Sequence, residues 1–241
     1  MVKARTGRWR PLWAALCAGL ALSAPALAEC RLALLLALDI SSSVNRTEDR
    51  LQREGLAAAL VSPAVLQALL ANAPDHVALA AYEWSGRYQQ DQIIGWRALR
   101  NEADIRATAE AIRTSRRSYA EFPTAAGFAM SHAVVQFQSA PACLFRTLDV
   151  SGDGVNNDGY SPAQVHLNHR LQGVTVNGLA IGGATENDAD VIRFYREELI
   201  YGPGAFVEIA RDYRDFERAM RRKLIREVSP REVAHLEAAQ P

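Results

Sequence analysis

An aspartate and two serines follow a long apolar run near the start of the chain, in the order Asp39-Ile40-Ser41-Ser42-Ser43. Because alternate residues of an extended backbone point the same way, Asp39, Ser41 and Ser43 can share one concavity. One carboxylate and two hydroxyls are hard oxygen ligands of the kind that Mg²⁺, Mn²⁺ and Ca²⁺ prefer. The same residue types are favoured at helix N-caps, and taken alone the motif favours a cap on the helix that follows.

Two further segments carry oxygen ligands at comparable places in the pattern. Thr124 follows the Phe122-Pro123 turn, where we expect a helix to begin, and Asp153-Gly154 follows an apolar run that reads as a strand. If the strands are parallel, their carboxyl ends meet at one edge of the sheet, where ligands bind in doubly wound folds. Three distant segments would then deliver hydroxyls and acids to one place, which favours a cation site over a simple cap.

The elements that must position these residues alternate short apolar runs with amphipathic stretches, a pattern typical of a parallel sheet flanked by helices. We expect strands over 32–38, 76–84, 92–96, 144–150, 174–181 and 205–209. Helices are expected over 48–71 with a break near Ser62-Pro63, over 102–113, 124–136, 188–199 and 212–228, and briefly from Pro162. The predicted fold is therefore α/β, a doubly wound and mostly parallel six-stranded sheet with helices on both faces.

These motifs resemble the metal-ion-dependent adhesion site of von Willebrand factor A-like domains, and the resemblance covers 32–228. It implies that Ser41 and Ser43 coordinate a divalent ion directly and that Thr124 does so directly or through water. Asp39 and Asp153 would act largely through water, and a carboxylate from a protein partner would complete the shell. The stretches 149–154 and 202–206 resemble a bacterial secreted branch of this fold that has no assigned function.

Asp149 competes with Asp153 for the second acidic position, and the cysteines give a test of register. Cys30 lies nine residues before Asp39, and Cys143 lies ten before Asp153. In the fold that the resemblance implies, these two strands are neighbours, so nearly equal offsets place the cysteines side by side at the far end. The offset from Asp149 is only six residues, which favours Asp153 as the metal aspartate and predicts a Cys30–Cys143 disulfide.

The first 28 residues read as a secretory signal peptide: a basic start, an apolar run, and the small-residue site Ala26-Leu27-Ala28. We expect residues 29–230 to form one von Willebrand A-like domain and 231–241 to be a frayed tail. Cleavage removes four of the 27 basic residues and none of the 27 acidic ones, so the mature chain carries a charge of about −4. That balance does not suggest nucleic-acid binding, and no later segment is apolar enough to span a membrane.

Two other kinds of site share some of these residues. The stretch 149–154 matches the first half of an EF-hand loop, but position twelve is Tyr160 rather than a bidentate glutamate. Asn156, Asn157 and Asp158 then remain as a secondary calcium site or, with stronger support, a solvated turn. Asp39 after a buried strand also resembles the nucleophile of haloacid dehalogenase-like enzymes, although Ser41 stands where those enzymes usually carry a second aspartate.

The function that these observations favour is non-enzymatic. We expect a divalent-cation-dependent protein-binding module of the bacterial cell envelope, periplasmic or secreted, that holds Mg²⁺, Mn²⁺ or Ca²⁺ and binds a protein ligand presenting an acidic residue. The alternatives are a metal-dependent hydrolase that uses Asp39 and a structural envelope protein with a vestigial metal site.

Overall fold

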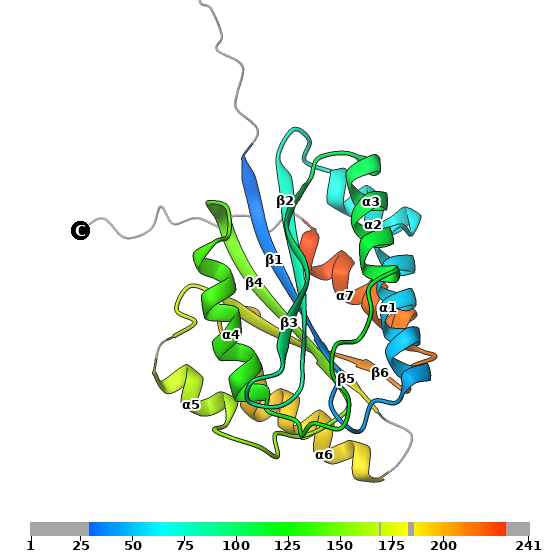
Figure 1. Cartoon of the computed structure of the whole chain (residues 1–241). Coiled ribbons are helices and arrows are strands. Elements are labelled where there is room, and N and C mark those ends of the chain that lie inside the picture. The colour runs from blue at the N-terminus through cyan, green and yellow to red at the C-terminus, as the bar shows by residue number, and fades with distance from the viewer. Residues whose placement is uncertain (1–28, 169, 183–185, 230–241) are drawn as a thin grey trace, which may run out of the picture.

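The computed structural model of the 241-residue chain describes residues 29–168, 170–182 and 186–229. The predicted signal peptide and the predicted frayed tail lie outside the described residues. The described part forms a three-layer arrangement, with a central twisted sheet between two sets of helices (Figure 1).

The sheet has six strands in the order β3-β2-β1-β4-β5-β6, all parallel except β3, which runs antiparallel to β2. This confirms the predicted fold class. The strands are β1 Cys30–Asp39, β2 His76–Trp84, β3 Gln90–Leu99, β4 Cys143–Gly152, β5 Thr175–Ile181 and β6 Val207–Ala210. Every residue of β1 is buried, as expected for a central strand covered on both faces.

Helices cover both faces of the sheet, and alternate residues of β1 contact different sets (Figure 1). Leu34, Leu36 and Leu38 belong to the apolar core on one face, whereas Leu35 and Ala37 belong to the core on the other. The first face carries α1 Arg46–Leu60, α2 Pro63–Leu70, α3 Glu102–Arg113 and α7 Phe216–Val228. The second carries α4 Ala126–Gln138, α5 Pro162–Leu167, α6 Glu186–Phe194 and the π-helical turn η1 Tyr195–Leu199.

Several helix boundaries differ from the predicted ones. The break at Ser62-Pro63 is confirmed, because Pro63 starts a separate helix whose N-cap is Ser62. The predicted helix 124–136 starts two residues later, at Ala126, and the predicted helix 212–228 starts only at Phe216. Among the described residues, no single helix is long and apolar enough to cross a membrane, although α1 and α2, bent by 57°, satisfy that test when joined.

Cys30 and Cys143 lie opposite each other on the neighbouring strands β1 and β4. They form a disulfide with a Cα–Cα distance of 4.5 Å, at the end of β1 opposite to Asp39. The predicted pairing is therefore present, and it supports the strand register from which Asp153 was chosen. Because β1 and β4 are central strands, the bond joins the middle of the sheet at its amino edge.

Candidate metal centre

The Asp39–Ser43 motif forms the turn that leaves the carboxyl end of β1. Asp39 and Ser41 are fully buried, while Ser43 is exposed. The motif does not cap the next helix, because α1 has Asn45 as its N-cap, and Asn45 and Glu48 form a complete capping box. The interpretation of the motif as a helix cap is therefore wrong, and the hydroxyls of Ser41 and Ser43 remain available to bind an ion.

Hydrogen bonds join the three predicted segments into a closed ring. The Ser43 hydroxyl donates to Asp153 Oδ1 at 2.5 Å and lies 3.1 Å from the Ser41 hydroxyl, which links the β1 turn to the β4 loop. The backbone N–H of Ser42 donates to the Phe122 carbonyl at 2.8 Å, which links the β1 turn to the segment before α4. All three segments therefore meet at the carboxyl edge of the sheet.

The third side of the ring connects Thr124 to the β4 loop through Asn157. The Thr124 N–H donates to Asn157 Oδ1 and the Asn157 N–H donates to the Thr124 carbonyl, both at 2.9 Å. The N-cap of α4 is Ala125, not Thr124, and the first-turn N–H of Gly127 donates to Asn156 Oδ1 rather than to the threonine. Gly154 lies against the threonine, since a Cβ added there would be 3.3 Å from Thr124 Oγ1. Thr124 is thus placed by its backbone, and its hydroxyl is not used to cap α4.

Asp39 is a buried carboxylate, and only one of its two oxygens accepts a hydrogen bond from the described residues. Its Oδ1 accepts a hydrogen bond of 2.7 Å from the Ser41 N–H, but its buried Oδ2 has no hydrogen-bond partner among the described residues. Burial and then the charge of Asp153 raise the pKa of Asp39 to about 7, against the hydrogen bonds from Ser41 and the charge of Arg117. A buried, unpaired carboxylate oxygen of this kind fits a cation, which would supply the missing positive charge.

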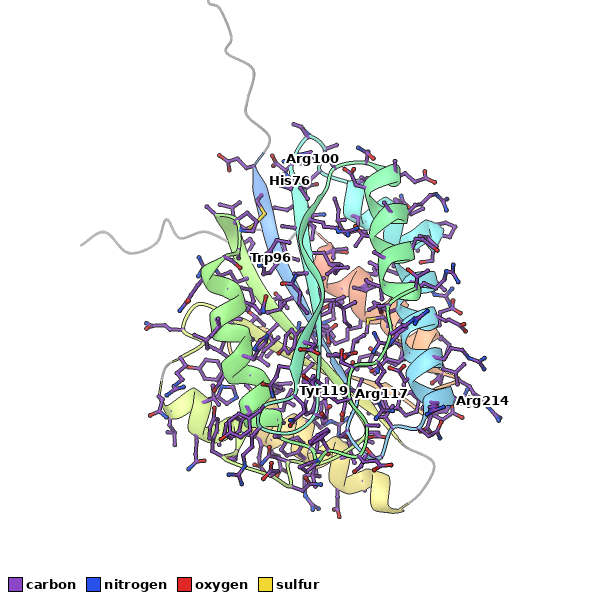
Figure 2. All side chains as sticks on the ribbon, viewed as in Figure 1. His76, Trp96, Arg100, Arg117, Tyr119 and Arg214 are labelled. Carbon is purple, nitrogen blue, oxygen red and sulfur yellow. A yellow bond between two sulfur atoms is a disulfide. The ribbon has the colours of Figure 1, made fainter. Side chains whose placement is uncertain are left out.

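Arg117 is a site residue that the sequence did not reveal. It lies in the irregular segment between α3 and α4, near the carboxyl ends of the strands (Figure 2). Its guanidinium donates to the carbonyls of Ile40 and Ser41 at 2.6 and 3.1 Å, and also to the Val44 carbonyl. These bonds therefore fix the backbone of the Asp39–Ser43 turn. Nothing in the sequence separates it from the neighbouring Arg116.

Gln52 of α1 holds the two central strands together beneath the site. Its side-chain N–H donates to the Asp39 carbonyl at 3.0 Å, and its Oε1 accepts a hydrogen bond of 3.2 Å from the Ser151 hydroxyl. Gly152 leaves no space beside Asp39, since a Cβ there would lie 2.6 Å from Asp39 Oδ2 and 2.8 Å from the Tyr195 hydroxyl. The site is thus rigidly supported on its buried side.

Asp149 and the β4 loop are not organised as a calcium site. Asp149 is buried within the sheet, opposite Leu36, and lies 2.8 Å from the Lys223 ammonium rather than at the carboxyl edge. In the loop, Asn156 Oδ1 accepts a hydrogen bond from a helix N–H, and Asp158 forms an ion pair with Arg87 at 2.7 Å. These side chains therefore brace the loop, which supports a structural turn over an EF-hand.

The predicted donor set consists of two acids and three hydroxyls. Across the residues that the structure describes, no cluster of three or more histidines, cysteines and acids could hold a metal. A cation at this edge would therefore depend on Ser41, Ser43 and Thr124 together with Asp39 and Asp153, which is a set of hard ligands suited to Mg²⁺, Mn²⁺ or Ca²⁺.

Residues 29–232 match the family described as "Protein of unknown function (DUF1194)", and no curated protein matches the sequence. Similar solved structures include a von Willebrand factor type A protein from Catenulispora acidiphila, at 17% identity and a TM-score of 0.58, over 83% of this chain and 43% of that one. The pilus adhesin SpaC from Lactobacillus rhamnosus GG is 12% identical with a TM-score of 0.59, over 83% of this chain and 30% of SpaC.

A third similar structure is proximal thread matrix protein 1 from the mussel byssus, whose metal-ion-dependent adhesion site (MIDAS) is occupied by zinc. It is 14% identical with a TM-score of 0.56, over 82% of this chain and 48% of that protein. The chain thus spans less than half the length of each of these three proteins. At these identities the comparisons establish a von Willebrand A-like α/β fold.

Proposed function

The chain belongs to the DUF1194 family of unknown function, and we propose that its mature part is a non-enzymatic protein-binding module that depends on a divalent cation. Ser41, Ser43 and Thr124 would hold the ion, while Asp39 and Asp153 would offset its charge and orient its water. The bound ion would supply an electrophilic centre that accepts an anionic oxygen from outside the protein.

The observation that carries this proposal is the unpaired Oδ2 of Asp39. A fully buried carboxylate oxygen without a partner costs free energy, on the order of 1–3 kcal/mol or more for a charged group. The other oxygen of Asp39 is bonded to the Ser41 N–H, and the Ser41 hydroxyl contacts that of Ser43, which donates to Asp153. A divalent ion at this position removes the cost and uses the hydroxyls as ligands.

The side of the site that faces solvent supports a protein partner with an acidic group. Ser42 and Ser43 are exposed, so an incoming carboxylate can approach the ring. The segments that form this edge carry aromatic side chains: half-buried Tyr119 lies edge-on to Phe122 at 5.7 Å, and Tyr88 of the β2–β3 turn is 82% exposed. Exposed aromatic side chains are typical anchors of protein interfaces.

The disulfide supports a location in the periplasm or outside the cell, where disulfides form and persist. It joins the central strands, and its loop spans 113 residues. The predicted signal peptide at 1–28 agrees with this location, and export would bring the module into contact with envelope or extracellular proteins.

Calorimetric titration of Mn²⁺ and Mg²⁺ into the purified mature protein tests the proposal. We expect binding by the wild type and at least a tenfold loss of affinity in Ser41→Ala/Ser43→Ala. Ser42→Ala is the matched control, because the adjacent side chain lies outside the ring and its backbone N–H is unchanged. Equal affinity in all three proteins would remove the site from consideration.

The partner is sought by affinity capture from an envelope extract with and without chelator. A protein retained only in the presence of the ion, and released by excess acetate or by an aspartate-containing peptide, would support an acidic ligand. Hydrolysis of a generic phosphate ester that is lost in Asp39→Asn would instead overturn the non-enzymatic assignment.

A further inference from the structure

A second group of charged residues lies inside the protein, between the sheet and α7. Lys223 and Glu227 of α7 and Asp149 of β4 have exposed fractions of 0, 2 and 1%. The Lys223 nitrogen lies 2.8 Å from Asp149 Oδ1 and 2.6 Å from Glu227 Oε1. One amine therefore contacts two carboxyl groups in a space closed to solvent, and the candidate metal centre uses none of them.

The two carboxyl groups are held differently. Glu227 Oε1 accepts hydrogen bonds from the Lys223 amine and from Asn177 Nδ2, the latter at 2.7 Å. Asp149 Oδ1 lies 2.8 Å from the same Lys223 nitrogen in an ion pair, and the Asp149 carboxyl also interacts with Glu227. Two donors thus hold Glu227 Oε1 as an acceptor, whereas Asp149 contacts the Lys223 nitrogen directly.

The surroundings favour the neutral form of Asp149. Asp149 lies in the middle of a central strand opposite Leu36, and the ring of Phe206 is 5.3 Å from the Lys223 nitrogen. Burial, more than any neighbouring charge, raises the pKa of Asp149 to about 7. A protonated Asp149 in contact with the Lys223 nitrogen, beside the Glu227 carboxyl and closed to solvent, holds the reactants for amide formation.

We propose that Lys223 and Asp149 condense into an intramolecular isopeptide bond, with Glu227 as the group that transfers the protons. Glu227 takes a proton from the Lys223 ammonium, and the free amine attacks Cγ of protonated Asp149. The C–O bond of the carboxylic acid then breaks, and its hydroxyl leaves as water with a second proton from the same nitrogen. An ammonium, a carboxylic acid and a carboxylate become an amide, a water molecule and a protonated Glu227, so no oxidant or co-reactant is needed.

Two physical effects favour this reaction in the folded protein. The fold fixes the amine and the carboxyl in contact, which replaces a bimolecular encounter by a pre-oriented one. The product also removes a buried ammonium and a buried carboxylate, both of which are costly in an apolar interior. The bond would tie the closing helix α7 covalently to a central strand, independently of whether the cation site is occupied.

Peptide mass spectrometry of the reduced, trypsin-digested mature protein tests the proposal. The expected product is a branched peptide in which 147–170 is joined to 223–226, with a mass one water below the sum of the two peptides. Trypsin cannot cleave after a Lys223 that is acylated, so this product differs from every linear peptide. Cleavage after Lys223 together with a linear 147–170 at full mass, in protein incubated at pH 7, would overturn the proposal.

Two variants separate the roles of the residues. Lys223→Arg keeps a cation in the cluster but has no amine, so it must give only linear peptides. Glu227→Gln keeps the size of the side chain but cannot accept the proton, so we expect at least a tenfold slower appearance of the branched peptide. Undiminished linkage in Glu227→Gln, or a bond that maps to Glu227, would contradict the assigned roles.

Discussion

The protein contains two places where acidic side chains are brought together, and it balances their charge in different ways. At the carboxyl edge of the sheet, Asp39 and Asp153 share a ring of neutral hydroxyls, and the nearby cation, Arg117, donates its hydrogen bonds to backbone carbonyls. In the interior, Asp149 and Glu227 lie against the Lys223 amine. The first cluster leaves the buried Oδ2 of Asp39 unpaired, and the second contains the Lys223 amine, which can balance an acid or, as we propose, bond to it.

This difference indicates what each cluster is for. A group that has its own cation, and that is closed to solvent, needs nothing from outside and serves the integrity of the fold. A group that lacks one, beside the exposed Ser43, would take a cation from solution under the proposed function. Removing a charged group from the interior cluster, and then from the cluster at the carboxyl edge, tests this contrast.

The largest effect is expected from Lys223→Met. The substitution keeps most of the length of the side chain but removes the amine, so it leaves Asp149 and Glu227 buried without a cation and excludes the proposed bond. Breaking a buried pair on one side typically costs about 3–5 kcal/mol of unfolding free energy. Urea unfolding followed by circular dichroism measures the loss.

The control for this variant removes the acids as well. Lys223→Met/Asp149→Asn/Glu227→Gln has no unpaired charge, so it should recover part of the stability that Lys223→Met loses. A loss below about 1 kcal/mol in Lys223→Met, which is the value typical of an exposed ion pair, would contradict an interior charge balance.

A somewhat smaller effect is expected from Arg117→Gln, which removes the guanidinium that holds the motif backbone. We expect a loss of about 2–3 kcal/mol, because hydrogen bonds from a charged donor to the carbonyls of Ile40 and Val44 are lost. Cation affinity should fall with it, since the Ser41–Ser43 turn loses its support. Arg116→Gln is the matched control, and equal effects of the two substitutions would show that Arg117 has no special role.

Asp215 precedes α7 and provides a pH-dependent comparison away from both clusters. Its carboxylate accepts hydrogen bonds from Arg218 and from the Arg211 N–H, and these hold its pKa at about 2, below the usual 3.8. A lowered acid pKa stabilises the fold above the unfolded value and loses that contribution as the pH falls from about 4 to 2. Asp215→Asn should therefore cost about 2 kcal/mol at pH 7 and almost nothing at pH 2. A difference that does not change with pH would exclude this origin.

The fold class could be predicted from the sequence because the pattern of elements is strong. The continuous apolar run after Cys30 indicated a central strand, and Pro63 indicated a helix break. The cysteine offsets predicted the β1–β4 register once the resemblance had made these strands neighbours. The start of α4 was placed too early, since Thr124 and Ala125 lie in the turn before it. Boundaries of this kind depend on tertiary contacts, here the pairing of Thr124 with Asn157, which the sequence pattern does not encode.

The candidate site was predictable to the extent that its residues follow strand ends or precede a helix. Asp39, Ser43 and Asp153 meet where parallel strands would bring them, while the ion itself remains a prediction. Arg117 and Gln52 were not predictable, because each acts through contacts with distant backbone or side-chain atoms. The interior cluster was missed for the same reason: Lys223 lies on a helix rich in arginine and lysine that reads as a solvated surface, and only the packing of α7 shows that it is buried.

The most direct test of a missing cation is the melting temperature of the wild type and Asp39→Asn, each measured in chelator and in excess Mg²⁺ or Mn²⁺. In chelator, Asp39→Asn should be the more stable protein by about 1 kcal/mol, because it removes a buried unpaired charge without changing shape. With the ion present, the wild type should gain stability through binding and the variant should not, so that their order reverses. A variant that is less stable in both conditions, or that gains as much from the ion as the wild type, would contradict a cation site built on Asp39.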